Sequence, residues 1–190
     1  MKHVLVALLA TTVFAAGAHA QQQNQKVRPA YNYAGVKYFT QDLDFDNGFE
    51  CTQDGIFVDG SFDVNGAVFA HGSFGDVSGD GCGSTTLAAG VGYRSAWGEA
   101  SHLYGTLAFT DTSVDEGNGD SGLVLGGGIR GFVVPGIEGY FEVEHSTAFD
   151  KSTVANFGGA YWVNKDFSAT LDIGFGSDQR SLAIGARMNF

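Results

Sequence analysis

The last eleven residues, RSLAIGARMNF (Arg180–Phe190), decide the fold class. Large apolar or alanine side chains alternate strictly with small or polar ones along this stretch. The apolar positions are Leu182, Ile184, Ala186, Met188 and Phe190. Because successive side chains of a strand point to opposite faces, this alternation predicts a strand with one apolar and one polar face. Such a strand is typical of a wall between lipid and a polar lumen.

The other end of the chain has the pattern of a secretory signal peptide. Lys2 precedes an apolar run over Val4–Ala16, and Ala18-His19-Ala20 is typical of a cleavage site. We therefore expect cleavage after Ala20 and export of the mature chain. The expected organisation is a signal peptide over 1–20, a polar periplasmic lead-in over 21–30, and one transmembrane β-barrel domain over 31–190.

Composition and charge exclude several classes of protein. The chain has 29 Gly and 2 Pro in 190 residues, with no collagen-like triplet repeat. The formal net charge of −11 becomes −12 once Lys2 is removed, which argues against binding to nucleic acid. After residue 20, no apolar run approaches the roughly 18 to 20 residues that a membrane helix needs. If the mature chain crosses a membrane, it must therefore do so as a closed barrel.

Ten segments of strand length follow the lead-in. They cover 31–40, 54–63, 66–75, 84–95, 102–110, 122–133, 137–146, 153–163, 167–176 and 180–190. Their connectors alternate between short and long, as expected for periplasmic turns and external loops. The long connectors 41–53, 76–83 and 111–121 are expected on the external side. The sequence thus predicts an all-β, up-and-down antiparallel barrel of ten strands, with eight strands as the alternative.

Charge is confined to one face of the predicted strands. The apolar face carries no charged residue, and a basic residue there would cost about 2 to 4 kcal/mol at the membrane midplane. The inward face carries His71 and eight charged residues: Lys37, Asp59, Arg94, Arg130, Glu142, Glu144, Asp172 and Arg187. These include four basic and four acidic residues, so we predict pairing, with Arg130 diagonally opposite Glu142. The prediction is a plugged polar lumen; the alternative is a narrow porin-like channel.

Cys51 and Cys82 are the only two cysteines, and both fall in predicted external connectors. An even pair in an exported chain predicts a disulfide. It would link two neighbouring loops. A metal or redox role is not expected, because the pair lacks further thiolates and CxxC spacing.

Matches to catalytic and ligand-binding motifs are weak. Gly126–Gly131 fits a dinucleotide-binding pattern but lies within a predicted strand and leads into no helix. Asp42–Asn47 begins like a calcium loop yet lacks its glycine and its final glutamate, and solvated acids in an external loop are the simpler interpretation. His71 and Ser73 share a face, but that face is lumenal. We expect no enzyme activity, no catalytic, metal-binding or cofactor-binding residues, and no cofactor.

The terminal strand resembles the C-terminal assembly signal of outer-membrane β-barrels, in which alternating apolar residues end in Phe. As a whole the chain is similar to small barrels of the OmpA transmembrane domain and OmpX/Ail type. That resemblance implies a monomer in the bacterial outer membrane, in contact with lipid, lipopolysaccharide and the barrel assembly machinery. It also implies a structural or surface role in the cell envelope, with surface or host ligands bound through the external loops. A lipid A-modifying barrel enzyme is a less favoured alternative.

Overall fold

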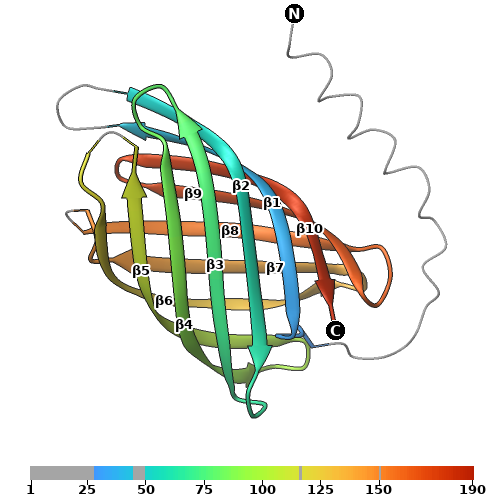
Figure 1. Ribbon diagram of the computed structural model, residues 1–190. Helices are drawn as coiled ribbons and strands as arrows, with labels where there is room; N and C mark the ends of the chain where they lie inside the picture. The colour runs from blue at the N-terminus through green and yellow to red at the C-terminus, as the bar shows by residue number, and fades with distance from the viewer. Residues whose placement is uncertain (1–27, 45–49, 116, 150) are drawn as a thin grey trace, which may run out of the picture.

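The computed structural model describes residues 28–190 apart from 45–49, 116 and 150 (Figure 1). The predicted signal peptide and most of the lead-in lie outside the described residues. Within the described residues, no helix has the length and apolar character to cross a membrane.

The fold is a closed, ten-stranded antiparallel β-barrel, as the sequence predicts, so the alternative of eight strands is wrong. The strands are β1 (Tyr33–Asp44), β2 (Glu50–Asp63), β3 (Val68–Gly79), β4 (Ser84–Trp97), β5 (Ser101–Val114), β6 (Asp120–Val134), β7 (Ile137–Ser146), β8 (Ser152–Trp162), β9 (Phe167–Gly176) and β10 (Gln179–Asn189). Each strand pairs with its sequence neighbours, and β1 pairs with β10 to close the barrel. Closure leaves no strand edge unpaired.

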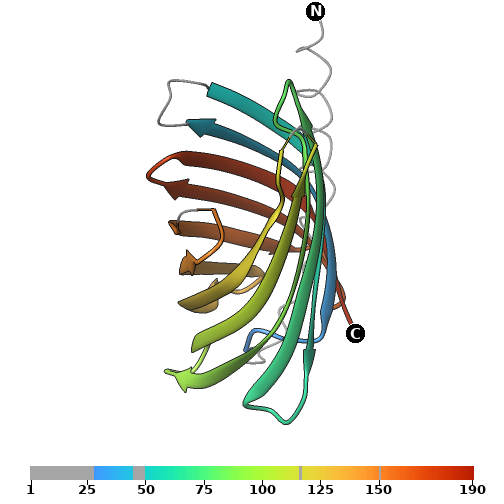
Figure 2. The ribbon, with the colours of Figure 1, turned by 60° about the vertical axis from the view of Figure 1, so that its left-hand side comes forward.

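The strands cross one another strongly. In Figure 1, β2, β3, β4 and β5 run steeply along the near wall, whereas β7, β8 and β9 run across the far wall. The rotated view in Figure 2 shows the same curvature from the side. This is the right-handed twist of paired strands accumulated around a closed sheet. Side chains from opposite walls therefore meet inside the barrel.

Several predicted external loops are shorter than expected. The β1–β2 ladder continues to Asp44 and Glu50, and the β5–β6 ladder continues to the pair Thr112 and Asp120. Residues 41–44, 50–53, 76–79 and 111–114 are thus strand rather than loop. Polar composition suggested loops there, but polar side chains do not end a strand whose backbone groups are all paired with its neighbour. Cys51 consequently lies in β2 and not in a connector.

The outer face of the barrel is apolar and uncovered. Large outward side chains include Ile56, Leu87, Phe109, Leu125 and Ile184, which are 48%, 59%, 55%, 62% and 56% exposed. A soluble β-sandwich would show the same alternation of apolar and polar side chains, but its apolar face would pack against a second sheet. The described residues form one sheet, so nothing in the described structure covers these side chains.

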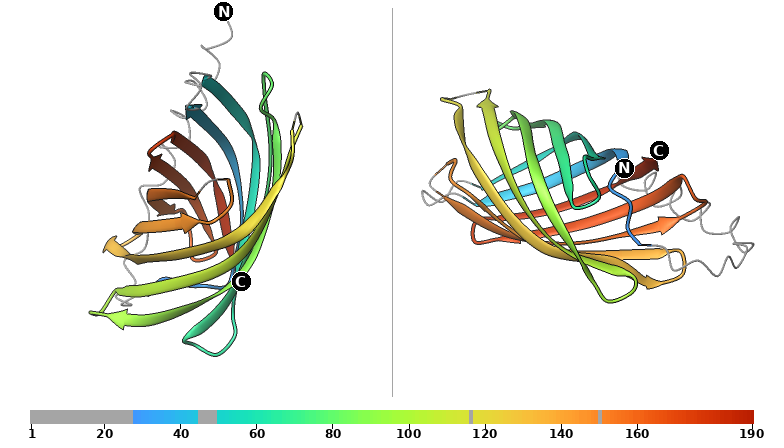
Figure 3. Two further views of the ribbon diagram at one scale, coloured as in Figure 1. Left: turned by 90° about the vertical axis from the view of Figure 1, so that its left-hand side faces the viewer. Right: turned by 90° about the horizontal axis from the view of Figure 1, so that it is seen from below.

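The chain before β1 lies across one opening of the barrel. Residues 28–32 form no strand, and Figure 3 (right) shows this stretch crossing the opening at the end that holds the C terminus. Arg28 donates to the backbone oxygen of Glu99 in the β4–β5 turn. At the other end of the stretch, Asn32 accepts from the backbone nitrogens of Asp63 and Phe190. We call the end of the barrel that holds the C terminus and residues 28–32 the turn end. We call the opposite end, which holds the disulfide, the loop end.

Candidate functional site in the barrel lumen

A polar cavity of about 350 Å³ occupies the lumen. Inward side chains of every strand except β4 line it, together with Tyr31. Most of the charged residues predicted to face inward lie on its walls: Lys37, Asp59, Arg130, Glu142, Glu144, Asp172 and Arg187. His71 lines it as well and packs its ring 6.0 Å from that of Phe69.

Glu138 in β7 is the centre of the charged cluster at the turn end. Its side chain is only 2% exposed. Arg187 Nη2 lies 2.8 Å from Glu138 Oε2, and Arg130 Nε donates to Glu138 Oε1. Trp162 Nε1 also donates to Oε2, at 3.2 Å. One carboxylate therefore binds donors from β6, β8 and β10, and we call Arg130, Glu138 and Arg187 the Glu138 cluster.

Aromatic rings pack around the two arginines of the Glu138 cluster. The guanidinium carbon of Arg187 lies 4.8 Å from the ring centre of Trp162 and 5.1 Å from that of Tyr33. Arg130 lies 5.4 Å from the same Tyr33 ring. Cation–π contacts of this length add to ion pairing where water is excluded. The cluster therefore combines charge neutralisation with close packing across the lumen.

Tyr31 lies at the turn end of the lumen, next to that cluster. It is 4% exposed, and its ring centre lies 4.6 Å from that of Phe69 and 5.7 Å from that of His102. The guanidinium of Arg94 lies over the ring at 4.2 Å. Burial is the main reason that the pKa of Tyr31 is raised above its usual value, so the phenol stays protonated at neutral pH. Residues 28–32 therefore pack against the barrel at its turn end.

A second charged group lies across the cavity. Lys37 Nζ in β1 is 2.9 Å from Asp172 Oδ2 in β9 and 3.6 Å from Asp59 Oδ1 in β2. Tyr140 donates to the other oxygen of Asp172 at 2.7 Å. One lysine is therefore shared between two carboxylates, which leaves this group with an excess negative charge.

Glu142 and Glu144 have a different environment. They are two residues apart on the inner face of β7, and Asn156 Nδ2 donates to Glu144 at 2.8 Å. The Tyr104 hydroxyl lies beside Glu142. Among the described residues, no Lys, Arg or His side chain forms an ion pair with either carboxylate. Each acid therefore faces the cavity beside the other acid, with a neutral hydrogen-bonding side chain and no ion-pair partner among the described residues.

Three details of the lumen differ from the sequence-based prediction. Arg130 forms its ion pair with Glu138 and not with Glu142, because Glu138 faces inward close to the β6–β7 turn and lies nearer the guanidinium. Arg94 lies at the turn end, paired with Asp63 and hydrogen-bonded to the backbone of Gly66. Glu138 and Asp63 were not counted among the inward charges, so the predicted balance of four against four is wrong.

The residues that sequence reasoning missed carried a usable signal. Glu138 has the same parity in β7 as Glu142 and Glu144, so strict alternation places all three on one face. Glu138 was left out of the predicted inward charges because it lies close to a predicted turn, at the end of its segment. Tyr31 has the same parity as the inward Lys37 in the predicted segment 31–40, but it lies before β1, and its contacts with β3, β4, β5 and β6 had no signal in the sequence.

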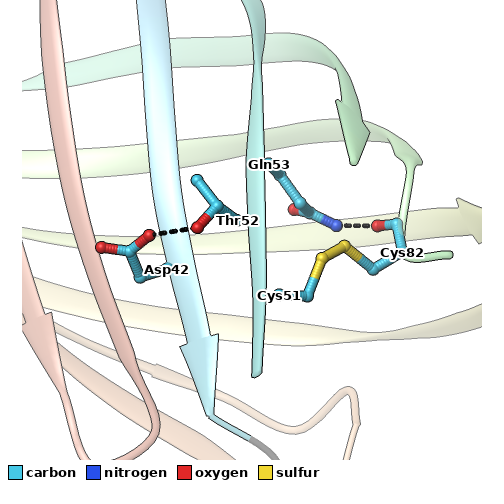
Figure 4. Close-up of a disulfide and its surroundings, with 5 residues drawn as sticks. All are labelled: Asp42, Cys51, Thr52, Gln53 and Cys82. Atoms are coloured by element: carbon cyan, nitrogen blue, oxygen red, sulfur yellow. Dashed lines mark hydrogen bonds between the residues drawn. A yellow bond between two sulfur atoms is a disulfide. The ribbon is translucent and has the colours of Figure 1, made fainter. Parts of the chain in front are cut away.

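The predicted disulfide between Cys51 and Cys82 is present, with 6.5 Å between the two Cα atoms (Figure 4). It joins β2 to the β3–β4 turn, and the Gln53 side chain donates to the backbone oxygen of Cys82 beside it. Thr52, which lies between Cys51 and Gln53 in the sequence, points to the opposite side of β2 and donates to Asp42 at 2.7 Å. The described residues contain no group of three or more His, Cys, Asp or Glu side chains that could hold a metal ion.

Comparisons with known proteins place the fold among outer-membrane barrels. An outer membrane channel from Pseudomonas putida F1 matches with a TM-score of 0.54 and 13% identity, over 90% of this chain and all of the other. The KdgM porin in complex with disordered oligogalacturonate matches with a TM-score of 0.50 and 14% identity, over 83% of this chain and 99% of that one. No family model and no curated protein matches the sequence. At these identities the likeness is one of fold.

Proposed function

We propose that this chain is a small integral protein of the bacterial outer membrane whose lumen is closed at the turn end, and that its role is structural or surface-related. One observation carries the proposal: an uncovered apolar outer wall encloses a charged interior in which ion pairs join different strands. Charges inside and apolar groups outside suit a barrel surrounded by lipid and no other environment. The fold likeness to outer-membrane channels supports the same location.

The closed state is supported by the arrangement of the lumen. The Glu138 cluster spans the interior from β6 to β10, and the Tyr31 ring lies next to it. In an open porin the inward charges are solvated rather than joined across the lumen. The proposed orientation puts the turn end and Phe190 in the periplasm and the disulfide outside, because short turns are typical of the periplasmic side.

The competing function is a narrow porin-like channel, which the cavity and the fold likeness to porins favour. Single-channel recording in planar bilayers separates the two. The closed barrel should give no steady conductance above the bilayer background, whereas a narrow pore gives discrete, reproducible steps. Such steps in the wild-type protein would contradict the closed barrel and establish the channel.

We further propose that the terminal strand guides assembly through the barrel assembly machinery, with Leu182, Ile184, Ala186, Met188 and Phe190 as the recognised face. Phe190 is 68% exposed and lies on the outward face of the wall. Replacing Phe190 with Ser should lower the yield of heat-modifiable barrel in cells far more than replacing the adjacent, opposite-facing Asn189 with Ser. Equal yields for the two variants would refute this role.

The remaining partners follow from the same location. We propose contacts of the outer wall with lipid and lipopolysaccharide, and binding of surface or host ligands through the external loops. Protease treatment of intact cells should then cleave within 111–121 or 41–53. Cleavage restricted to the short turns would reverse the proposed orientation.

A further inference from the structure

We propose that the lumen cavity is a binding site for a short organic dication, a diamine or polyamine, with Glu142 and Glu144 as its principal anchor. The proposal rests on the closed, cavity-bearing barrel described above but requires no particular surface role. It starts from the charge of the cavity wall, which carries five carboxylates against three basic groups.

The internal basic groups are already committed to other carboxylates. Arg130 and Arg187 are both held by Glu138, and Lys37 is held between Asp59 and Asp172. None of the three forms an ion pair with Glu142 or Glu144. Two carboxylates two residues apart in a water-poor space repel each other unless a cation or a proton is added. A ligand ammonium between them would remove that repulsion.

A second observation points to a ligand in the same cavity. Thr170 and Ser61 line the cavity, are 8% and 6% exposed, and have hydroxyl oxygens with no hydrogen-bond partner. Buried polar atoms are usually satisfied, and both hydroxyls can accept a hydrogen bond. They would accept from a second ammonium.

The cavity wall also offers a surface for an aliphatic linker. The Phe39 and Phe57 rings, 6.1 Å apart, both line the cavity and offer an apolar surface to methylene groups. A cavity of about 350 Å³ falls at the lower end of the range for small-molecule sites, roughly 300 to 1,000 Å³. An inorganic divalent ion fits less well, because the described residues offer no cluster of three or more acidic or imidazole ligands.

Isothermal titration of the refolded full barrel with three probes of equal chain length tests this inference. The probes are 1,5-diaminopentane, 5-aminopentanoate and glutarate, which carry two, one and no ammonium groups. We expect the diamine to bind at least about ten-fold more tightly than 5-aminopentanoate, and glutarate not to bind. Equal binding of all three, equal binding of magnesium ion, or binding of none would overturn the proposal.

Paired variants locate the site. The double change Glu142→Gln and Glu144→Gln should weaken diamine binding by about ten-fold or more, and Thr170→Val should weaken it by a smaller factor. The control double change Glu50→Gln and Asp111→Asn removes two carboxylates from exposed positions and should leave affinity unchanged. Equal loss in both double variants would overturn the lumen site. Heat-modifiable mobility confirms the barrel in every sample, so absent binding by an intact barrel refutes this inference and not the membrane role.

Discussion

Glu138 and Glu142 lie four residues apart on the inner face of β7, yet they occupy opposite electrostatic situations. Glu138 is 2% exposed and is shared by two arginines, whereas Glu142 is half-buried, lies beside Glu144 and forms no ion pair with a described basic side chain. Removing a buried carboxylate that is paired with two cations strongly destabilises the fold, because the cations are left buried without a counter-charge. A carboxylate beside a like charge contributes little to stability and is free to bind something else. One strand, β7, therefore carries a structural carboxylate near the turn end and, further along, the carboxylates of the proposed binding site.

The largest expected effect comes from removing the carboxylate of the Glu138 cluster. Glu138→Gln leaves Arg130 and Arg187 buried without a counter-charge and should lower the free energy of unfolding by about 3 to 5 kcal/mol. Urea unfolding in lipid vesicles, followed by tryptophan fluorescence, measures it. The matched control is Glu142→Gln, for which we expect less than about 1 kcal/mol. An equal decrease in the free energy of unfolding for both variants would show that Glu138 and Glu142 do not differ in their contribution to stability.

The loop end has no counterpart of the Glu138 cluster among the described ion pairs and is tied by a covalent bond instead. Replacing Cys51 and Cys82 with Ser releases a link of sequence separation 31, which should cost about 3 to 4 kcal/mol by the chain-entropy model. The same urea titration measures the change. Wild-type barrel treated with reductant serves as control and should unfold like the variant. An unchanged midpoint in both would show that the loop end does not depend on the disulfide.

Variants of Tyr31 test whether residues 28–32 contribute to the stability of the turn end. Tyr31→Ala removes a buried ring packed against Phe69 and His102 and should cost about 3 kcal/mol. Tyr31→Phe keeps the ring and removes a buried hydroxyl that has no hydrogen-bond partner, so its stability should equal or slightly exceed the wild-type value. Thermal unfolding midpoints of the pair decide the matter, and similar losses for both variants would contradict the packing role.

The smallest effect is expected at the acidic pair. The double change Glu142→Gln and Glu144→Gln removes like-charge repulsion and should leave stability unchanged or raise it by about 1 kcal/mol. The urea midpoint of the double variant, compared with that of the wild type, measures it. A loss comparable to that of Glu138→Gln would mean that the pair is structural.

Much of this architecture could be predicted from alternation alone. The period of two placed Lys37, Asp59 and Asp172 on the inner face, and it placed Leu125 and Ile184 on the outer face, because a strand admits only two side-chain directions. The number of strands and the Cys51–Cys82 bond also followed from local pattern. Strand ends were less accurate at the loop end, since polar residues such as Gln41 and Thr112 suggested loops where the ladder continues.

Pairing within the lumen could not be predicted in the same way. Arg187 reaches Glu138 from a strand 49 residues away in sequence, and Lys37 bridges β2 and β9. These partners depend on the stagger of ten strands and on how strongly opposite walls cross. A small error in either moves a long side chain to a different carboxylate. The predicted Arg130–Glu142 pair failed for this reason.

The sequence by itself determined that the chain forms an antiparallel barrel of ten strands with its charges inside, because hydrophobic periodicity and segment length are local properties of the chain. Only the tertiary structure decided which inward carboxylates are neutralised and which remain available. The Coulomb energy of two charges is inversely proportional to their separation, so ion pairing depends on where side chains from distant strands meet. Glu138, in the cluster, and Glu142, beside the cavity, have the same chemistry and lie on the same face of β7, and they differ in the side chains that reach them from other strands.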